Sequence, residues 1–122
     1  MTCTVVEEGF TNCDVASAVA NQMAETAPYK MDKVRTFAHV LAISNTVVMT
    51  VELNAPKSAF NGQDLAQMGK DELAEQMRTA DSGMCEIVRE AKIAYEMSAE
   101  SSDGYELYSY IIDEATCDIY GK

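Results

Sequence analysis

The spacing of apolar residues changes period several times along the chain, and each change predicts a secondary-structure element. The first pattern is helical, because Val15, Val19 and Met23 recur at every fourth position. Thr11 or Asn12 is expected to cap this helix, since either side chain can accept a hydrogen bond from a free amide of the first turn. The first element of the domain is therefore predicted to be an amphipathic helix.

The period shortens to two in the middle of the chain, which indicates strands. Side chains alternate between two faces over Arg35–Ile43 and again over Thr46–Leu53. Ser44 and Asn45 separate the two runs, and asparagine tolerates the left-handed backbone of tight hairpin turns. We therefore expect these runs to form an antiparallel hairpin.

Helical and strand patterns then follow each other once more. A loop rich in Asn and Gly leads to a helical region in which Leu73 and Met77 lie four positions apart, and a short further helix is expected over residues 84–91. Alternation returns at residues 93–97, and it is longest from Tyr105 to Cys117. These two runs predict a second hairpin.

The order of elements predicts an α+β fold with a four-stranded antiparallel sheet, built from two hairpins and covered on one face by the helices. Residues 1–10 are expected to form an N-terminal lead, and residues 11–122 a single domain of ordinary size. The side chains expected to be largely buried are Val47, Met49, Val51, Leu53, Leu73, Met77, Ile93, Tyr95, Leu107 and Ile111.

Charge narrows the range of partners. The chain carries 20 acidic and 9 basic side chains, so its formal net charge is −11. Such a field repels nucleic-acid backbones and anionic membranes, whereas it favours solubility and speeds encounter with basic proteins. No apolar run is long enough to span a membrane, so membrane insertion is not expected. Solubility alone is a sufficient reason for the charge, and capture of a basic partner is the alternative.

Catalytic chemistry finds little support in the residue pattern. His39 is the single histidine, and it falls within a predicted strand with no cysteine near it in sequence. The neighbouring acids Asp113 and Glu114 would point to opposite faces of a strand, so they cannot form a carboxylate pair. Phosphate-loop, dinucleotide, zinc-protease and serine-nucleophile motifs are missing from the sequence. We expect no enzyme activity, no metal and no cofactor.

Methionine and tyrosine supply the candidate binding residues. The chain has 8 methionines and 6 tyrosines, and both residue types are common at protein interfaces and in ordinary cores. Tyr105, Tyr108 and Tyr110 are expected to cluster on the last predicted strand, with Tyr95 on the neighbouring one. The candidates for partner contact are Met77, Met84, Tyr95, Tyr108 and Tyr110.

The cysteines bear on the compartment. Cys3, Cys13, Cys85 and Cys117 show no C-x-x-C spacing, and one histidine is too few for the common zinc sites. Four scattered cysteines in a short chain fit two disulfides in an oxidising compartment. Buried free thiols in a cytoplasmic protein are the alternative. No signal-peptide pattern is visible, so the periplasm and the cytoplasm both stay open as locations.

The order of these features resembles that of the small α/β pilotins of type II secretion systems, which are periplasmic accessory lipoproteins of Gram-negative bacteria. The shared features are an alanine-rich helix at 15–27, a Pro-Tyr-Lys segment at 28–30, a hairpin at 34–53, a helix at 63–78, Ile-Ala-Tyr at 93–95 and Ala-Thr-Cys at 115–117.

The resemblance implies a disulfide between Cys85 and Cys117, because pilotins bond a cysteine near the end of the second helical region to one that closes the last strand. Cys3 and Cys13 would then pair with each other. The resemblance also implies a non-catalytic periplasmic domain that binds a helical tail of a secretin subunit. The alternative function is that of an acidic inhibitor or immunity protein that captures a basic toxin or enzyme. The oligomeric state is not indicated.

Overall fold

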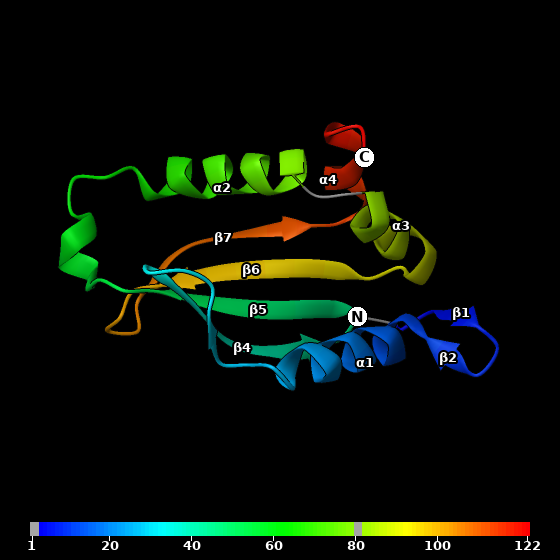
Figure 1. Ribbon diagram of the computed structural model, residues 1–122. Helices are drawn as coiled ribbons and strands as arrows, with labels where there is room; N and C mark the ends of the chain where they lie inside the picture. The colour runs from blue at the N-terminus through cyan, green and yellow to red at the C-terminus, as the bar shows by residue number, and fades with distance from the viewer. Residues whose placement is uncertain (1–2, 80–81) are drawn as a thin grey trace.

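The computed structural model describes residues 3–79 and 82–122, which form an α+β fold in which helices pack against a sheet (Figure 1). The elements are β1 (Val5–Glu7), β2 (Phe10–Thr11), α1 (Asn12–Ala24), β3 (Tyr29–Lys30), β4 (Arg35–Ile43), β5 (Thr46–Leu53), the 3-10 helix η1 (Lys57–Phe60), α2 (Leu65–Thr79), α3 (Ser82–Ala91), β6 (Ala94–Glu100), β7 (Glu106–Ile112) and α4 (Glu114–Ile119).

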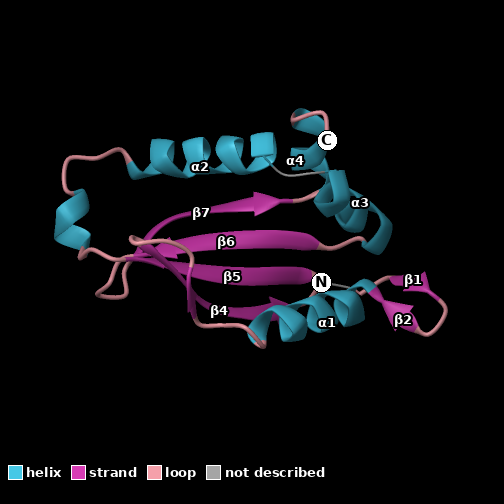
Figure 2. Ribbon diagram, in the orientation of Figure 1, coloured by secondary structure: helices cyan, strands magenta, loops and turns pink. Residues whose placement is uncertain are grey.

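The main sheet corrects the prediction of four antiparallel strands. It has five strands in the order β3-β4-β5-β6-β7, and β5 and β6 are parallel, with Thr46 opposite Ala94. The reason is the connection between them, which runs through η1, α2 and α3 and returns the chain to the end of the sheet where β5 began (Figure 2). The two-residue strand β3 pairs with β4, and β1 and β2 form a separate two-stranded sheet within the lead.

Strand register shows why α1 and the layer of α2 and α3 pack against the same face of the sheet. Val47 on β5 lies opposite Tyr95 on β6, which lies opposite Ile112 on β7, so the three side chains point to the same side. Val47 belongs to the core cluster that includes Ala16 of α1, whereas Ile112 belongs to the cluster beneath α2 and α3. Tyr95 packs against both clusters, which makes the two halves of the core continuous.

The central hairpin is confirmed with the predicted bounds, since β4 and β5 span Arg35–Ile43 and Thr46–Leu53. Its turn differs in one detail: the residue with a left-handed backbone is Ser44, at a φ of 58°. Asn45 instead donates a hydrogen bond from its side chain to the Lys92 carbonyl, 3.1 Å away. The asparagine therefore anchors the turn to the segment that enters β6.

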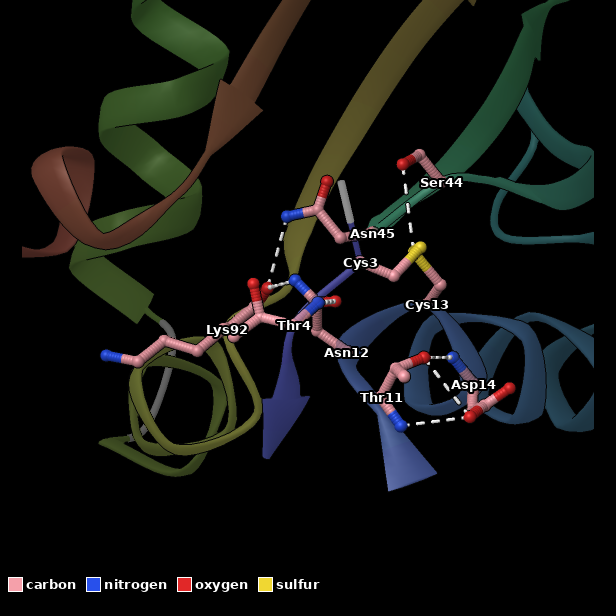
Figure 3. Close-up of a disulfide and its surroundings, with 9 residues drawn as sticks. All are labelled: Cys3, Thr4, Thr11, Asn12, Cys13, Asp14, Ser44, Asn45 and Lys92. Atoms are coloured by element: carbon pink, nitrogen blue, oxygen red, sulfur yellow. Dashed lines mark hydrogen bonds between the residues drawn. A yellow bond between two sulfur atoms is a disulfide. The ribbon is translucent and has the colours of Figure 1, made fainter. Parts of the chain in front are cut away.

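The first helix begins at a reciprocal cap on Thr11. The Asp14 amide donates to the Thr11 hydroxyl at 3.2 Å, and the Thr11 amide donates to the Asp14 carboxylate at 2.9 Å (Figure 3). Asn12 is buried; it accepts a hydrogen bond from the Thr4 amide and donates one to the Lys92 carbonyl. These bonds hold the lead against the end of the sheet.

The end of the last strand was wrongly predicted. β7 stops at Ile112, and the residues expected to continue it, including Cys117, form α4. Asp113 causes the change, because its carboxylate accepts the Thr116 amide at 2.9 Å and so caps a new helix. Asp113 and Glu114 are thus helix-start residues rather than a strand pair.

Burial on β7 also differs from expectation. Tyr110 and Ile112 are buried on the helix-covered face, whereas Ile111 points to the open face with 45% of its surface exposed. Of the other residues expected in the core, Leu53, Leu73 and Tyr95 are only partly buried. The remaining six are buried: Val47, Met49, Val51, Met77, Ile93 and Leu107.

Two disulfides join the cysteines in the pairs that were expected. Cys3 is bonded to Cys13, which ties the lead to α1 (Figure 3). Cys85 of α3 is bonded to Cys117 of α4, and both residues are buried. The second bridge therefore links two helices rather than a helix and a strand.

Candidate protein-binding groove

A groove of about 450 Å³ lies between α2 and the segment that joins β3 to β4, with strands of the main sheet as its floor. Its walls combine apolar side chains with charged and amide groups. The lining residues are Met31, Arg35, Val51, Leu53, Glu72, Glu75, Gln76, Thr79, Met84, Met97, Ala99, Tyr108 and Tyr110.

The floor of the groove is apolar because alternate positions of three neighbouring strands face it. Val51 lies opposite Ala99, and Met97 lies opposite Tyr110, so these four side chains share one face of the sheet. Met84 adds a flexible apolar side chain from α3. Methionines at two sides of the groove allow it to adapt to the side chains of a partner.

Arg35 on β4 connects the hairpin to α2 along the rim of the groove. Its guanidinium bonds the Asp32 carboxylate at 2.8 Å and the Glu72 carboxylate at 3.2 Å. The backbone amide of Val34 and the side chain of Arg35 lower the pKa of Asp32, and the hydrogen bond to Asp32 raises the pKa of Arg35. All three side chains are more than one-third exposed, so these pairs position the rim and contribute little stability.

Two tyrosines present neutral hydroxyls to the groove. Burial raises the pKa of Tyr110, and burial followed by the nearby Glu72 charge raises the pKa of Tyr108. The Tyr110 hydroxyl donates to the side-chain oxygen of Gln76 at 2.6 Å. A protonated hydroxyl can donate a hydrogen bond, so the floor carries a fixed polar point among apolar side chains.

The five side chains predicted for partner contact divide between the groove and the core. Met84, Tyr108 and Tyr110 line the groove. Met77 lies on the inner side of α2 and is fully buried, so it supports the groove from behind. Tyr95 packs between the two halves of the core and lies outside the lining.

Sequence reasoning missed other lining residues, above all Met31, Arg35 and Met97. Met31 lies in an irregular segment with no periodic pattern, and Arg35 is recognisable only once its partners on another element are known. Met97 belongs to a predicted strand, but the sequence does not show whether a strand residue is covered by α2 or lines the groove. Each of these assignments depends on contacts between distant segments.

The remaining candidate chemistry is dispersed. His39 lies opposite Thr50 on the open face of the sheet, and all four thiols are in disulfides, so a Cys–His nucleophile pair is excluded. Among residues 3–79 and 82–122, no group of three or more histidine, cysteine or acidic side chains is arranged to hold a metal ion. The helices in these ranges include none of the length and apolar character needed to cross a membrane.

Comparison with solved structures shows what this fold resembles. The pilotin EpsS of the Vibrio vulnificus type 2 secretion system aligns with a TM-score of 0.68 at 13% identity, over 87% of this chain and 91% of EpsS. The type II secretion pilotin AspS of Vibrio cholerae aligns with a TM-score of 0.64 at 13% identity, over 87% and 92% of the two chains.

A third structure covers still more of the chain. PA3611, a proposed secreted protein of Pseudomonas aeruginosa, aligns with a TM-score of 0.72 at 8% identity, over 95% of this chain and 99% of PA3611. No family model and no curated protein matches the sequence. Since the identities are low, the likeness concerns the fold, and it confirms the resemblance read from the order of elements: this chain has the fold of the type II secretion pilotins EpsS and AspS.

Proposed function

We propose that this chain is a non-catalytic, periplasmic, pilotin-like secretion accessory that binds a helical tail of a secretin subunit. The observation that carries the proposal is the groove beside α2, which occurs on a fold shared with two pilotins. The two disulfides support an oxidising compartment. The likeness to PA3611 supports a location in the cell envelope or beyond.

The chemistry of the groove fits an amphipathic helix. Such a helix binds by placing apolar side chains at spacings of three and four residues into a hydrophobic groove. Met84 and Met97 can adjust to those side chains, while the Tyr108 and Tyr110 hydroxyls can bond polar groups at their edge. Glu72 is paired with Arg35 and Glu75 with Arg78, so the rim carries charges of both signs that can meet polar side chains on the flank of the helix.

We expect Met31→Asp to weaken binding of a labelled secretin-tail peptide by about tenfold or more, because an apolar contact is replaced by a charge that must lose water. Met31 is 42% exposed, so the substitution leaves the core intact. Fluorescence anisotropy with a labelled peptide from the tail of a type II secretion secretin measures the effect.

Val34→Asp is the matched control. Val34 lies in the same segment and is 60% exposed, but it lies outside the groove lining. It should leave the peptide affinity within about twofold of the parent. Equal affinities for the parent and Met31→Asp would contradict the assignment of the groove as the binding site. A peptide that binds neither protein would contradict the secretin partner.

The net charge of −11 favours a second candidate function, that of an acidic inhibitor or immunity protein for a basic toxin or enzyme. In that case the association rate with the basic protein should fall by about tenfold or more as salt rises from low to physiological ionic strength, because exposed charges are screened beyond about 8 Å. Stopped-flow rates across a salt series measure this. A flat response would rule out steering and leave the charge as a solubility device.

A further inference from the structure

Strand β7 forms one edge of the main sheet, since the strand order ends there. The hydrogen-bond pattern of β6 decides which main-chain groups of β7 point away from the sheet. The Ala94 amide donates to the Asn45 carbonyl at 3.1 Å, so the main-chain groups of Ala94 point toward β5. Those of Tyr95 therefore point toward β7, where its partner is Ile112. Alternation then directs the main-chain groups of Ile111 away from the sheet.

The same alternation applies two positions earlier, at Ser109. Its partner across the ladder is Ser98, which also lies between hydrogen-bonded positions. An independent contact supports this assignment of the outward-facing main-chain groups. The Ile111 carbonyl accepts a hydrogen bond at 3.1 Å from the hydroxyl of Thr116, which lies outside the sheet. In the described part of the chain, no hydrogen bond from outside the sheet reaches the Ser109 amide, the Ser109 carbonyl or the Ile111 amide, and the register directs all three away from β6. They form an unpaired main-chain edge with the two-residue spacing of a strand.

A second groove runs beside this edge. It measures about 410 Å³ and lies between α2 and β7, where Ala66, Gly69 and Leu73 face Leu107 and Ser109. The helix approaches the strand closely at Gly69, because a Cβ there would lie 3.2 Å from the Cβ of Tyr108. Among the described residues that line this groove, the charged one is Lys70. The apolar walls can receive side chains from a segment that pairs with the edge.

We propose that β7 binds an extended, cationic segment of a partner protein as a sixth strand. Alternate apolar side chains of this segment would enter the second groove, between α2 and β7. Main-chain pairing suits the unpaired groups of Ser109 and Ile111.

Glu96 lies opposite Ile111, and Glu106 accepts a hydrogen bond from the Ser98 hydroxyl, so both acids lie on the open face of the sheet. They favour lysine or arginine at the alternate positions of the segment that face away from the groove and from Lys70. A second copy of this chain would add another charge of −11 and is disfavoured.

This surface adjoins the groove that carries the proposed function but lies on the other side of α2. Tyr108 and Tyr110 line both cavities and lie beneath α2, so the two sites flank one helix. A partner could occupy either site alone. The two inferences can therefore fail independently, and different probes test them.

The probe for the edge is a synthetic peptide of alternating valine and lysine, compared with the same peptide N-methylated at every second amide. Both carry the same charge, but the methylated form cannot complete a strand ladder. We expect the unmodified peptide to bind at least about tenfold more tightly, because several main-chain hydrogen bonds are lost on methylation. Hydrogen exchange should slow by about tenfold or more at the amides of Ser109 and Ile111 when the peptide is bound.

A protein variant tests the same contact from the other side. Ser109→Pro removes the outward amide without breaking a bond to β6, since proline is tolerated on the free side of edge strands. It should lower the affinity for the unmodified peptide by about tenfold, whereas Ser109→Ala, which keeps the amide, should leave that affinity unchanged. Neither variant should alter the affinity for a helical secretin-tail peptide.

Equal binding of the two peptides to the parent protein would overturn the proposal, since attraction would then rest on charge alone. This comparison does not depend on whether Ser109→Pro folds. Dimerisation of the parent protein in sedimentation experiments, abolished by Ser109→Pro, would also overturn it by identifying a second copy as the occupant.

Discussion

Removal of the Cys85–Cys117 disulfide by a double substitution to alanine should lower the free energy of unfolding by about 3–4 kcal/mol. The bridge joins residues 32 positions apart, so it removes much of the freedom of the unfolded chain. Both cysteines are buried, with Cys85 2% and Cys117 0% exposed. Denaturant titration monitored by circular dichroism measures the loss, which would be large against a typical total of about 5–15 kcal/mol.

The double substitution of Cys3 and Cys13 is the matched control. That bridge spans only 10 positions, so chain entropy predicts an effect smaller by about 1 kcal/mol. A loss for the Cys85–Cys117 variant equal to or below that of the control would contradict the prediction. Mass mapping of an unreduced digest tests the premise directly: free thiols on the Cys85 and Cys117 peptides would remove the main internal support for a periplasmic location.

Met77→Ala should destabilise the protein by about 2–5 kcal/mol, because it removes a fully buried side chain and leaves a cavity in the core. Met77 is 0% exposed and belongs to the cluster with Val88, Ile112 and the Cys85–Cys117 bridge. Thermal and denaturant unfolding of the variant measure the cost. Because Met77 also lies behind the groove, secretin-tail binding should be tested under conditions in which the variant is fully folded.

Leu73→Ala provides the comparison on the same helix. Leu73 lies one turn before Met77 but is only partly buried, so its truncation should cost about 1–2 kcal/mol, in proportion to the smaller apolar area that it removes from water. From periodicity alone, both residues were expected to be full core positions. A larger loss for Leu73→Ala than for Met77→Ala would show that α2 presents a different face to the sheet.

Sequence patterns predicted the elements whose formation depends on neighbouring residues in the chain. The alternation on either side of the Ser44 turn was sufficient to predict β4 and β5 to the residue, because a strand buried on one face must repeat every two positions. The cap of the first helix could be narrowed to Thr11 or Asn12 because capping depends on residues within one helical turn, and the structure shows that it is Thr11. Asp113 could have been assigned in the same way, but the apolar alternation before it concealed the start of α4.

The groove could be anticipated only in part. Met84, Tyr108 and Tyr110 were chosen for their residue type, and they do line it. Arg35 was not chosen, because its role depends on Glu72, 37 positions away on another element. A side chain that bridges two elements leaves no periodic trace in the sequence.

Composition and periodicity were enough to establish an acidic α+β domain with a central hairpin, since charge, helix faces and strand alternation are written in neighbouring residues. Tertiary structure decided the parallel pairing of β5 with β6, the separation of Met77 from the groove and the free edge at Ser109. Each of these depends on how the long connection through α2 and α3 returns to the sheet. Long-range pairing is selected by the burial of the whole core, which no local segment encodes by itself.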